Sequence, residues 1–220
     1  MASLIKPKTT QLQSFGKADV ELLEQSCLFQ GFFQLRQYRF KHKLFDGGWS
    51  EAISREVFER GDAVVVLPYD PVRDQVVLIE QIRIPALASS TTPWLLELVA
   101  GMIEHGEDRE SVARRELFEE TGLQCESMTA VSQYLPSPGG SSERLYFYWA
   151  KVDASQAEGV HGLAEEHEDI RLHVVARQHA YDLLEQGRID NAATVIGIQW
   201  LQLHYSRLML AHANGGSDEA

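Results

Sequence analysis

The stretch that decides the fold runs from Gly106 to Leu123 and reads GEDRESVARRELFEETGL. It predicts a helix that ends at Gly122, because glycine is the usual residue just past a helix C-terminus. Glu116, Glu119 and Glu120 lie within five positions of one another on this helix. At about 100° per residue, all three side chains project into one arc of about 100°. The stretch therefore concentrates negative charge on one helix face.

The charges of this helix allow two interpretations. Arg115 and Glu119 can form an ion pair, but Glu116 and Glu120 are four residues apart, which is a repulsive spacing. A solvated acidic face is the ordinary interpretation. The other is a site for Mg²⁺ or Mn²⁺, which proteins bind with carboxylates together with substrate phosphate. The spread of apolar residues around the helix favours burial, and buried carboxylates need partners, so we expect the metal site.

The overall composition is that of a globular protein. The chain has 220 residues, of which 44% are hydrophobic and 24% charged, and its net charge is -12. This length allows one domain with an extension, or two small domains. The negative charge argues against a protein that binds nucleic acid by neutralising phosphates. It does not exclude a small anionic substrate, because a bound cation reverses the local charge.

The cysteines and the apolar runs indicate the compartment. Cys27 and Cys125 are the only two cysteines, and they show no metal-ligand spacing with the eight histidines. We expect two reduced thiols and no zinc. The sequence shows neither a secretory signal nor an apolar run of membrane-spanning length. A cytoplasmic protein without a membrane partner is therefore expected.

The segments around the helix alternate between strand and helix patterns. Residues 28–60 alternate aromatic with basic residues and contain the turn signal DGGW, which predicts a small N-terminal sheet. Three predicted helices, including one that begins near Asp190 as its N-cap, accompany the predicted strands. This mixture indicates an α/β or α+β sandwich around a mixed sheet, with Trp94, Trp149 and Trp200 in the core. The predicted strands span 63–69, 75–84, 94–101, 128–134 and 144–152, and the other two helices span 106–122 and 176–187.

The spacing around the helix resembles the Nudix box. Gly101 is followed by five residues, Glu107, seven residues and then RELFEETGL from Arg115 to Leu123, so every specified position is filled. The resemblance implies an α/β/α sandwich around a mixed sheet, with a small N-terminal β extension. It also implies hydrolysis of a nucleoside diphosphate linked to another group, with Mg²⁺, or Mn²⁺ in its place, bound by the glutamates of the box.

Further segments are similar to one branch of that family, the bacterial ADP-ribose pyrophosphatases of the enterobacterial type. Pro138 lies sixteen residues beyond Gly122, and FFQLRQYRF, EQIRIPA and IDNAATVIGIQWLQLH also match. This branch implies hydrolysis of ADP-ribose, and of other ADP-sugars, to AMP and ribose 5-phosphate. It implies a homodimer that exchanges an N-terminal β subdomain at 1–58, followed by a Nudix hydrolase domain at 59–212 and a disordered tail at 213–220.

The resemblance also implies roles for the acidic residues. Arg115 pairs with a box glutamate such as Glu107 and is structural. The loop GLAEEHEDIR supplies Glu166 as the general base, although a slip of one position would give this role to Glu165. A solvated acidic loop is the alternative interpretation. The implied metal ligands are the carbonyl of Ala100 and the carboxylates of Glu116, Glu119, Glu120 and Glu168.

The implied substrate contacts come from several segments. Phe32 and Phe33 hold adenine across the dimer, with core packing as their alternative role. Arginines suit a diphosphate because their planar forks pair with phosphate oxygens, although a plain surface ion pair is the alternative for each of them. The residues implied around the ribose and the diphosphate are Arg55, Glu56, Arg60, Arg83, Met102, the turn of Ser137, Pro138 and Gly139, and Glu143.

Three other functions were weighed against ADP-ribose hydrolysis. A hydrolase of another nucleotide sugar, such as GDP-mannose, would share the same box. A non-catalytic Nudix module that senses ADP-ribose is a different class, and the intact box argues against it. A hydrolase of oxidised nucleotides or RNA caps agrees poorly with the acidic composition and with the position of Pro138.

Overall fold

The computed structural model describes residues 14–213, which fold into two compact units. The first contains the residues up to Arg60 together with the short segment Gly139–Ser142. The second contains Gly61–Pro138 and everything from Glu143 onward. Residues 214–220, which make up most of the predicted tail, lie outside the described residues.

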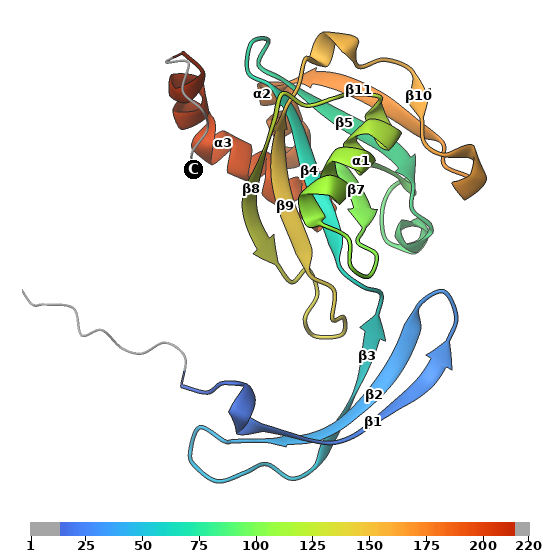
Figure 1. Ribbon diagram of the computed structural model, residues 1–220, viewed down its shortest axis with the longest axis vertical. Helices are drawn as coiled ribbons and strands as arrows, with labels where there is room; N and C mark the ends of the chain where they lie inside the picture. The colour runs from blue at the N-terminus through green and yellow to red at the C-terminus, as the bar shows by residue number, and fades with distance from the viewer. Residues whose placement is uncertain (1–13, 214–220) are drawn as a thin grey trace, which may run out of the picture. The chain divides into compact units, whose positions relative to one another are not determined.

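The N-terminal unit is a three-stranded antiparallel sheet in the order β1-β2-β3 (Figure 1). Its strands are β1 (Val20–Gln30), β2 (Gln34–His42) and β3 (Ile53–Glu59), preceded by a short 3-10 helix at Lys17–Asp19. The predicted DGGW turn lies between β2 and β3. β1 begins eight residues earlier than the predicted sheet, and a register shift between Leu22 and Glu24 interrupts its alternation there. Because the alternation is irregular, the sequence did not predict the N-terminal part of β1.

The second unit is built on a mixed sheet of eight strands. The main path runs in the order β10-β11-β5-β4-β9-β8, while β6 pairs with β5 and β7 with β4. β4 and β9 are parallel and the other pairs are antiparallel. The strands are β4 (Ala63–Asp70), β5 (Gln75–Ile82), β6 (Trp94–Glu97), β7 (Val99–Met102), β8 (Ser127–Tyr134), β9 (Leu145–Lys151), β10 (Val160–His161) and β11 (Ile170–Ala176).

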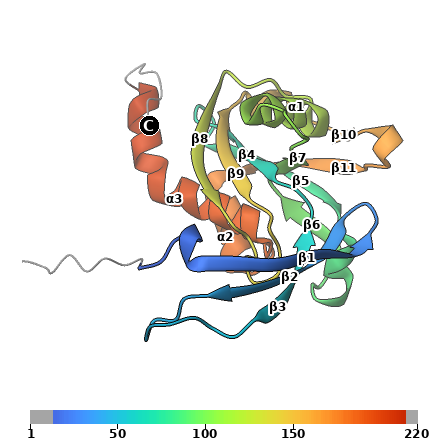
Figure 2. The ribbon, with the colours of Figure 1, turned by 60° about the horizontal axis from the view of Figure 1, so that its bottom comes forward.

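Helices cover both faces of this sheet (Figure 2). α1 (Arg109–Thr121) packs on one face, and α2 (Arg177–Glu185) and α3 (Ala192–Ala213) pack on the other. β4 is buried along its whole length and serves both cores. Val64 and Val66 point toward α1, whereas Val65 and Leu67 point toward α2 and α3. The predicted α/β/α sandwich around a mixed sheet is confirmed.

The segment predicted as one strand at 94–101 is two strands. Leu98 divides them, and its N–H donates to the Oγ1 atom of Thr194 in α3 at 2.9 Å instead of joining the sheet. β6 then pairs with β5, and β7 pairs with β4. The break brings the backbone of β7 directly under α1.

Two smaller expectations about this unit are wrong. The N-cap of α3 is Asn191, whose Oδ1 atom accepts the N–H of Thr194 at 3.0 Å, while Asp190 accepts a hydrogen bond from Ser90. Trp94 is half exposed at the start of β6, although Trp149 is buried as expected. Among the described residues, no helix has the length and apolar character needed to span a membrane.

Candidate active site

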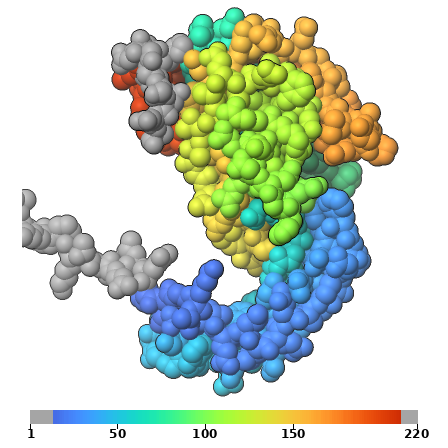
Figure 3. Space-filling view, viewed as in Figure 1, coloured from blue at the N-terminus to red at the C-terminus, as the bar shows by residue number. Residues whose placement is uncertain are grey.

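The glutamates of the predicted helix are positioned by α1 and its two caps. The side chain of Asp108 accepts the N–H of Ser111 at 2.9 Å and so starts the helix. Gly122, at φ 68°, ends it, as predicted. The outer side of the helix is open to solvent in Figure 3 (green), and Phe118 is 54% exposed there. The inner side buries Val112, Ala113 and Leu117 together with one carboxylate, that of Glu120.

Glu120 is the most buried of the three glutamates, with 3% of its surface exposed. One carboxylate oxygen accepts the N–H of Ala100 in β7 at 3.1 Å. Burial raises the pKa of Glu120 well above its usual value, and the nearby carboxylates of Glu116 and Glu168 raise it further. A cation bound beside Glu120 would therefore favour the ionised form of this buried carboxyl group.

Glu116 lies directly against the glycine of β7. A Cβ atom on Gly101 would overlap the carboxylate of Glu116, so the glycine makes room for this side chain. Burial raises the pKa of Glu116 to about 7, although the neighbouring Arg115 opposes the shift. The carboxylates of Glu119 and Glu168 raise this pKa as well. Glu116 thus belongs to the same acidic cluster as Glu120.

Arg115 supplies the positive charge nearest to this cluster. Its Nη1 atom lies 2.9 Å from Glu116 Oε1 and 3.0 Å from Glu119 Oε2. The expected pair with Glu107 is also present, but at 3.7 Å. Arg115 therefore neutralises part of the charge on the outer side of the cluster, and Glu120 lies beyond these three ion pairs.

The loop that precedes β11 brings a fourth glutamate to the helix. The N–H of Gly162 donates to the carbonyl of Glu119 at 3.4 Å, and the N–H of Leu163 donates to Glu168 Oε2 at 3.1 Å. Gly162 has a φ of 99°, and a Cβ atom there would lie 2.6 Å from Glu168 Cβ. In Figure 3 this segment (orange) lies beside α1. The structure thus brings together Ala100, Glu116, Glu119, Glu120 and Glu168.

The two candidates for the general base lie elsewhere on the same loop. Glu165 and Glu166 are in a short 3-10 helix at Ala164–Glu166, and both side chains are exposed. The backbone of this turn is ordered by a hydrogen bond from the N–H of Glu166 to the carbonyl of Leu163 at 3.0 Å. The role assigned to Glu166 therefore stays a prediction.

The donor atoms of the cluster are suited to a hard divalent cation. They are carboxylate oxygens, without histidine or cysteine, and this set favours Mg²⁺ or Mn²⁺ over zinc. Within residues 14–213, no three acidic, histidine or cysteine side chains yet converge as one ligand set. Glu116 and Glu119 are turned toward Arg115 instead, so binding a cation would require these two carboxylates to reorient.

The predicted substrate residues of the second unit come from the end of β5, the end of β7 and the segment between β8 and β9. The side chain of Arg83 makes an ion pair with Glu97. Its positive charge partly opposes the rise in the pKa of Glu120. Met102, at the end of β7, is 36% exposed. Ser137 and Pro138 lead into the predicted turn, which is present at 138–140, and Glu143 is buried.

The remaining predicted substrate residues belong to the N-terminal unit or its inserted segment. Phe32 is 86% exposed at the turn between β1 and β2, and its ring meets Phe33 edge-on at 4.7 Å between centroids. Arg60 lies over the ring of Phe33 at 5.5 Å. Phe32 is thus a surface residue in this chain and not a core residue. Arg55 and Glu56 are exposed on β3, and Gly139 belongs to the inserted segment.

Two buried ionisable residues were missed in the sequence. Glu97 is a largely buried carboxylate at the end of β6, and burial raises its pKa. Tyr134 has a buried hydroxyl without a hydrogen-bond partner in the described residues, and burial together with Glu143 raises its pKa to about 12. Both lie in strands whose pairing was unknown, so only the strand register could have placed them.

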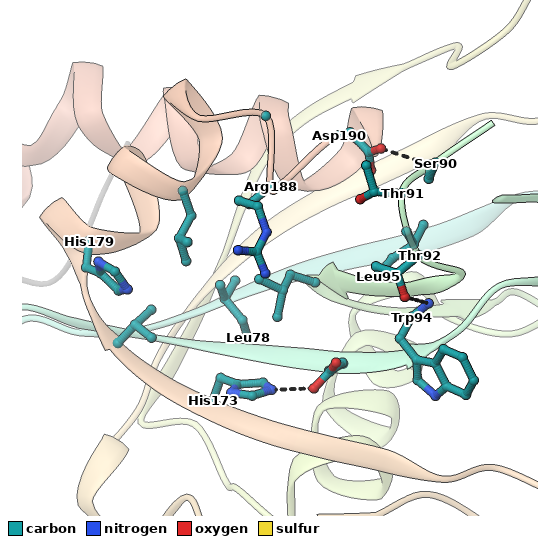
Figure 4. A pocket seen from close by; sticks show the side chains of 15 residues that line it. Leu78, Ser90, Thr91, Thr92, Trp94, Leu95, His173, His179, Arg188 and Asp190 are labelled. Atoms are coloured by element: carbon teal, nitrogen blue, oxygen red, sulfur yellow. Dashed lines mark hydrogen bonds and ion pairs between the residues drawn. The ribbon is translucent and has the colours of Figure 1, made fainter. Parts of the chain in front are cut away.

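A separate cavity of about 230 Å³ lies between β5, β11 and α2 (Figure 4). The Nε2 atom of His173 lies at hydrogen-bond distance, 2.8 Å, from Glu80 Oε2 across its floor, and the side chain of Arg188 points into the cavity. Leu78 also lines this cavity and belongs to the core under α2 and α3. The cavity is therefore on the sheet face opposite α1, and none of the predicted site residues line it.

The comparison with known families matches the NUDIX domain over residues 50–195. This chain belongs to the Nudix family. The family resemblance predicted from the motif is confirmed, and the acidic cluster described above is formed by its Nudix box and the loop before β11.

Similar proteins extend the match over almost the whole chain. The ADP-ribose pyrophosphatase of Escherichia coli (strain K12) is 57% identical over 205 residues, covering 93% of this chain and 98% of the relative. A GDP-mannose pyrophosphatase of Yersinia pestis (strain Pestoides F) is 32% identical, covering 84% and 93%. A solved structure described as an ADP compounds hydrolase has a TM-score of 0.64 at 22% identity, covering 86% and 97%, and shares the Nudix fold.

Proposed function

We propose that this Nudix protein is an enzyme that hydrolyses ADP-ribose to AMP and ribose 5-phosphate with the help of a divalent cation. The observation that carries the proposal is the cluster of Glu116, Glu120 and Glu168 between α1, β7 and the loop before β11. Its carboxylates repel one another in a partly buried place, which a bound cation would reverse. The relative at 57% identity is an ADP-ribose pyrophosphatase, which supports this substrate.

The cluster fits Mg²⁺, with Mn²⁺ as a second suitable ion. When bound, such an ion neutralises the charge of a diphosphate and makes a water molecule more acidic. The ligands in this proposal are the carboxylates of Glu116, Glu120 and Glu168, with Glu119 in a supporting place and the carbonyl of Ala100 as a backbone ligand. The N–H of Ala100 already fixes one oxygen of Glu120, which leaves the other oxygen for the cation.

The other residues act on the substrate and on the proton. Glu166 accepts the proton of the attacking water, with Glu165 as the alternative base. Arg83 offers its guanidinium to the phosphate oxygens, because the planar fork matches a pair of them. Adenine stacks on Phe32 and Phe33. The other proposed contacts, around the ribose and the diphosphate, are Arg55, Glu56, Arg60, Met102, Ser137, Pro138, Gly139 and Glu143.

The assembly in this proposal is a homodimer in the cytoplasm. The N-terminal part, residues 1–58, exchanges between the two copies, and the hydrolase domain spans 59–212. The exposed ring of Phe32 supports this arrangement, since its free face is accessible to a ligand or to another chain.

The test is the release of AMP from ADP-ribose with Mg²⁺, with Mn²⁺ and with a chelator in separate reactions. We expect that AMP release requires the divalent ion. We also expect AMP release from ADP-ribose to be faster than GMP release from GDP-mannose. Equal rates on both compounds would reject ADP-ribose as the preferred substrate, and the Yersinia relative is the reason to include GDP-mannose. Tight binding of ADP-ribose without hydrolysis in Mg²⁺ would instead identify a sensing module.

A further inference from the structure

Glu97 is a carboxylate beside the acidic cluster that has no part in the Nudix box. It is the last residue of β6 and pairs with Ile79 of β5. Directly paired residues in an antiparallel sheet point to the same face. Ile79 belongs to the core under α1, so Glu97 also points to the α1 face. Its side chain is 13% exposed, so this charge requires a specific partner.

That partner is Arg83. Glu97 Oε2 accepts the Nε–H of Arg83 at 2.8 Å. Burial raises the pKa of Glu97, and the positive charge of Arg83 opposes the shift. Because Arg83 is itself 43% exposed, the pair connects a buried acid to a solvent-facing cation. Glu97 is thus the buried end of this pair.

The backbone of Arg83 is fixed as well. Its N–H donates to the carbonyl of Pro93 at 2.7 Å, and its carbonyl accepts the N–H of Ala86 at 2.9 Å. The Nη1 and Nη2 groups have no hydrogen-bond partner in the described part of the chain. The positive charge of Arg83 nevertheless opposes part of the rise in the pKa of Glu120, so the guanidinium is close enough to interact with this glutamate of the Nudix box.

We propose that Glu97 is a positioning residue that orients Arg83 for the diphosphate of the substrate. By accepting the Nε–H, it occupies one edge of the guanidinium and leaves both Nη groups for phosphate oxygens. An arginine without this contact would have to lose the freedom of its side chain when substrate binds. This inference rests on the proposed diphosphate hydrolysis and deepens it, because it assigns a role to a residue outside the box.

The test is a double-mutant cycle between Glu97→Ala and Arg83→Ala, read by steady-state kinetics on ADP-ribose. In the Arg83 wild-type background, we expect Glu97→Ala to lower kcat/KM about 10- to 100-fold, mainly through KM. In the Arg83→Ala background, the same change should have an effect of less than about 2-fold. Equal losses in both backgrounds, or wild-type kinetics of Glu97→Ala, would overturn the proposal.

Conservative and control variants separate positioning from general damage. Glu97→Gln keeps an oxygen that can accept the Nε–H, so it should recover part of the lost kcat/KM relative to Glu97→Ala. It also keeps the size of the side chain, so the proposal stays testable if Glu97→Ala does not fold. Glu80→Gln is the matched control, because Glu80 precedes the same loop and pairs with His173 on the opposite sheet face. It should behave as wild type.

A failure of the proposal for Glu97 can be distinguished from a failure of the proposed function. If wild-type protein hydrolyses GDP-mannose but not ADP-ribose, the proposed substrate is wrong. The same double-mutant cycle can then be measured on GDP-mannose, which also carries a diphosphate. If it hydrolyses neither, the affinity for a non-hydrolysable ADP-ribose analogue replaces kcat/KM. A weaker affinity of Glu97→Ala that disappears in the Arg83→Ala background supports the positioning role. An unchanged affinity rejects it.

Discussion

At the scale of single residues, Glu120 is a proposed metal ligand in a place that disfavours its ionised form. It is buried, it lies near two other carboxylates, and only the N–H of Ala100 donates to it in the described residues. We predict that Glu120→Gln lowers turnover of ADP-ribose at least about 100-fold. The glutamine oxygen can keep the hydrogen bond from Ala100, and the like-charge repulsion disappears. The thermal stability measured in a chelator should therefore stay the same or rise.

The control for this prediction is Glu110→Gln on the exposed side of the same helix, where Glu110 pairs with Arg114 at 2.8 Å. Its turnover and its unfolding temperature should both be close to wild type, because exposed ion pairs contribute little. Wild-type kcat in Glu120→Gln would remove this carboxylate from the active site, and a large loss of stability would show that its charge is compensated in the folded protein.

Gly101 offers a second test at this scale, because its role is steric. A methyl group at this position would overlap the carboxylate of Glu116. We predict that Gly101→Ala displaces Glu116, reduces turnover strongly and lowers the free energy of unfolding by about 1–3 kcal/mol. Kinetics and chemical denaturation measure the two effects. Gly16→Ala is the control, because a Cβ atom there meets nothing within 4 Å. Full activity of Gly101→Ala would contradict the packing described for Glu116.

At the scale of elements, the turn between β4 and β5 depends on Asp70. Its buried side chain accepts the N–H groups of Val72, Arg73 and Ala154 at 2.9–3.0 Å and an Nη–H of Arg73 at 2.9 Å. Burial alone would raise the pKa of Asp70, but these hydrogen bonds outweigh it and lower the pKa below its usual value. The ionised side chain thus connects this turn to the start of the segment after β9.

We predict that Asp70→Asn lowers the free energy of unfolding by about 1–3 kcal/mol at pH 7. A lowered pKa in the folded state means that the contribution of Asp70 is present above the unfolded pKa of about 3.9. It is lost as the pH falls through the lower folded value. The difference between variant and wild type should therefore shrink below about pH 4. Urea unfolding at several pH values measures it, and a difference that stays constant down to pH 3 would contradict the assignment.

Local sequence patterns predicted most elements but not the contacts between distant ones. The apolar runs bounded by turn residues predicted the central strands, and the glycine after Thr121 predicted the end of α1, both close to the observed bounds. The break at Leu98 could not be predicted from the local sequence, because it depends on a hydrogen bond to the hydroxyl of Thr194, nearly one hundred residues later in the chain. Trp94 was expected in the core because tryptophan is apolar, yet its strand end leaves half of it exposed.

The same limit applies to the site. The box spacing was sufficient to select Glu116 and Glu120, because residues three or four apart on a helix are neighbours whatever surrounds them. Arg83 directly follows β5 and Glu97 ends β6, fourteen residues later, and their contact follows from the pairing of these two strands. A sequence without its strand register gives no reason to connect them. Glu97 was therefore missed, although its neighbour Arg83 was selected.

At the scale of the whole molecule, the N-terminal sheet leaves apolar side chains of its edge strand β1 exposed to solvent. β1 is exposed along almost its entire length, on both of its faces. Leu22 is 55% exposed and Leu28 is 48% exposed. Exposed apolar side chains on an edge strand favour pairing with another chain. A second copy of this chain would cover them in the proposed dimer.

We therefore predict a dimer in solution, with a mass of about twice the 24.8 kDa of one chain by light scattering. The double variant Leu22→Glu with Leu28→Glu should shift the protein toward the monomer, because a charge in a buried interface is costly. It should also lose turnover of ADP-ribose, since the proposal takes Phe32 and Phe33 from the exchanged part. Leu203→Glu is the control, because Leu203 is 81% exposed on α3 and has no role in the proposed interface. A monomeric wild-type protein with full activity at nanomolar concentration would show that one copy completes the site by itself.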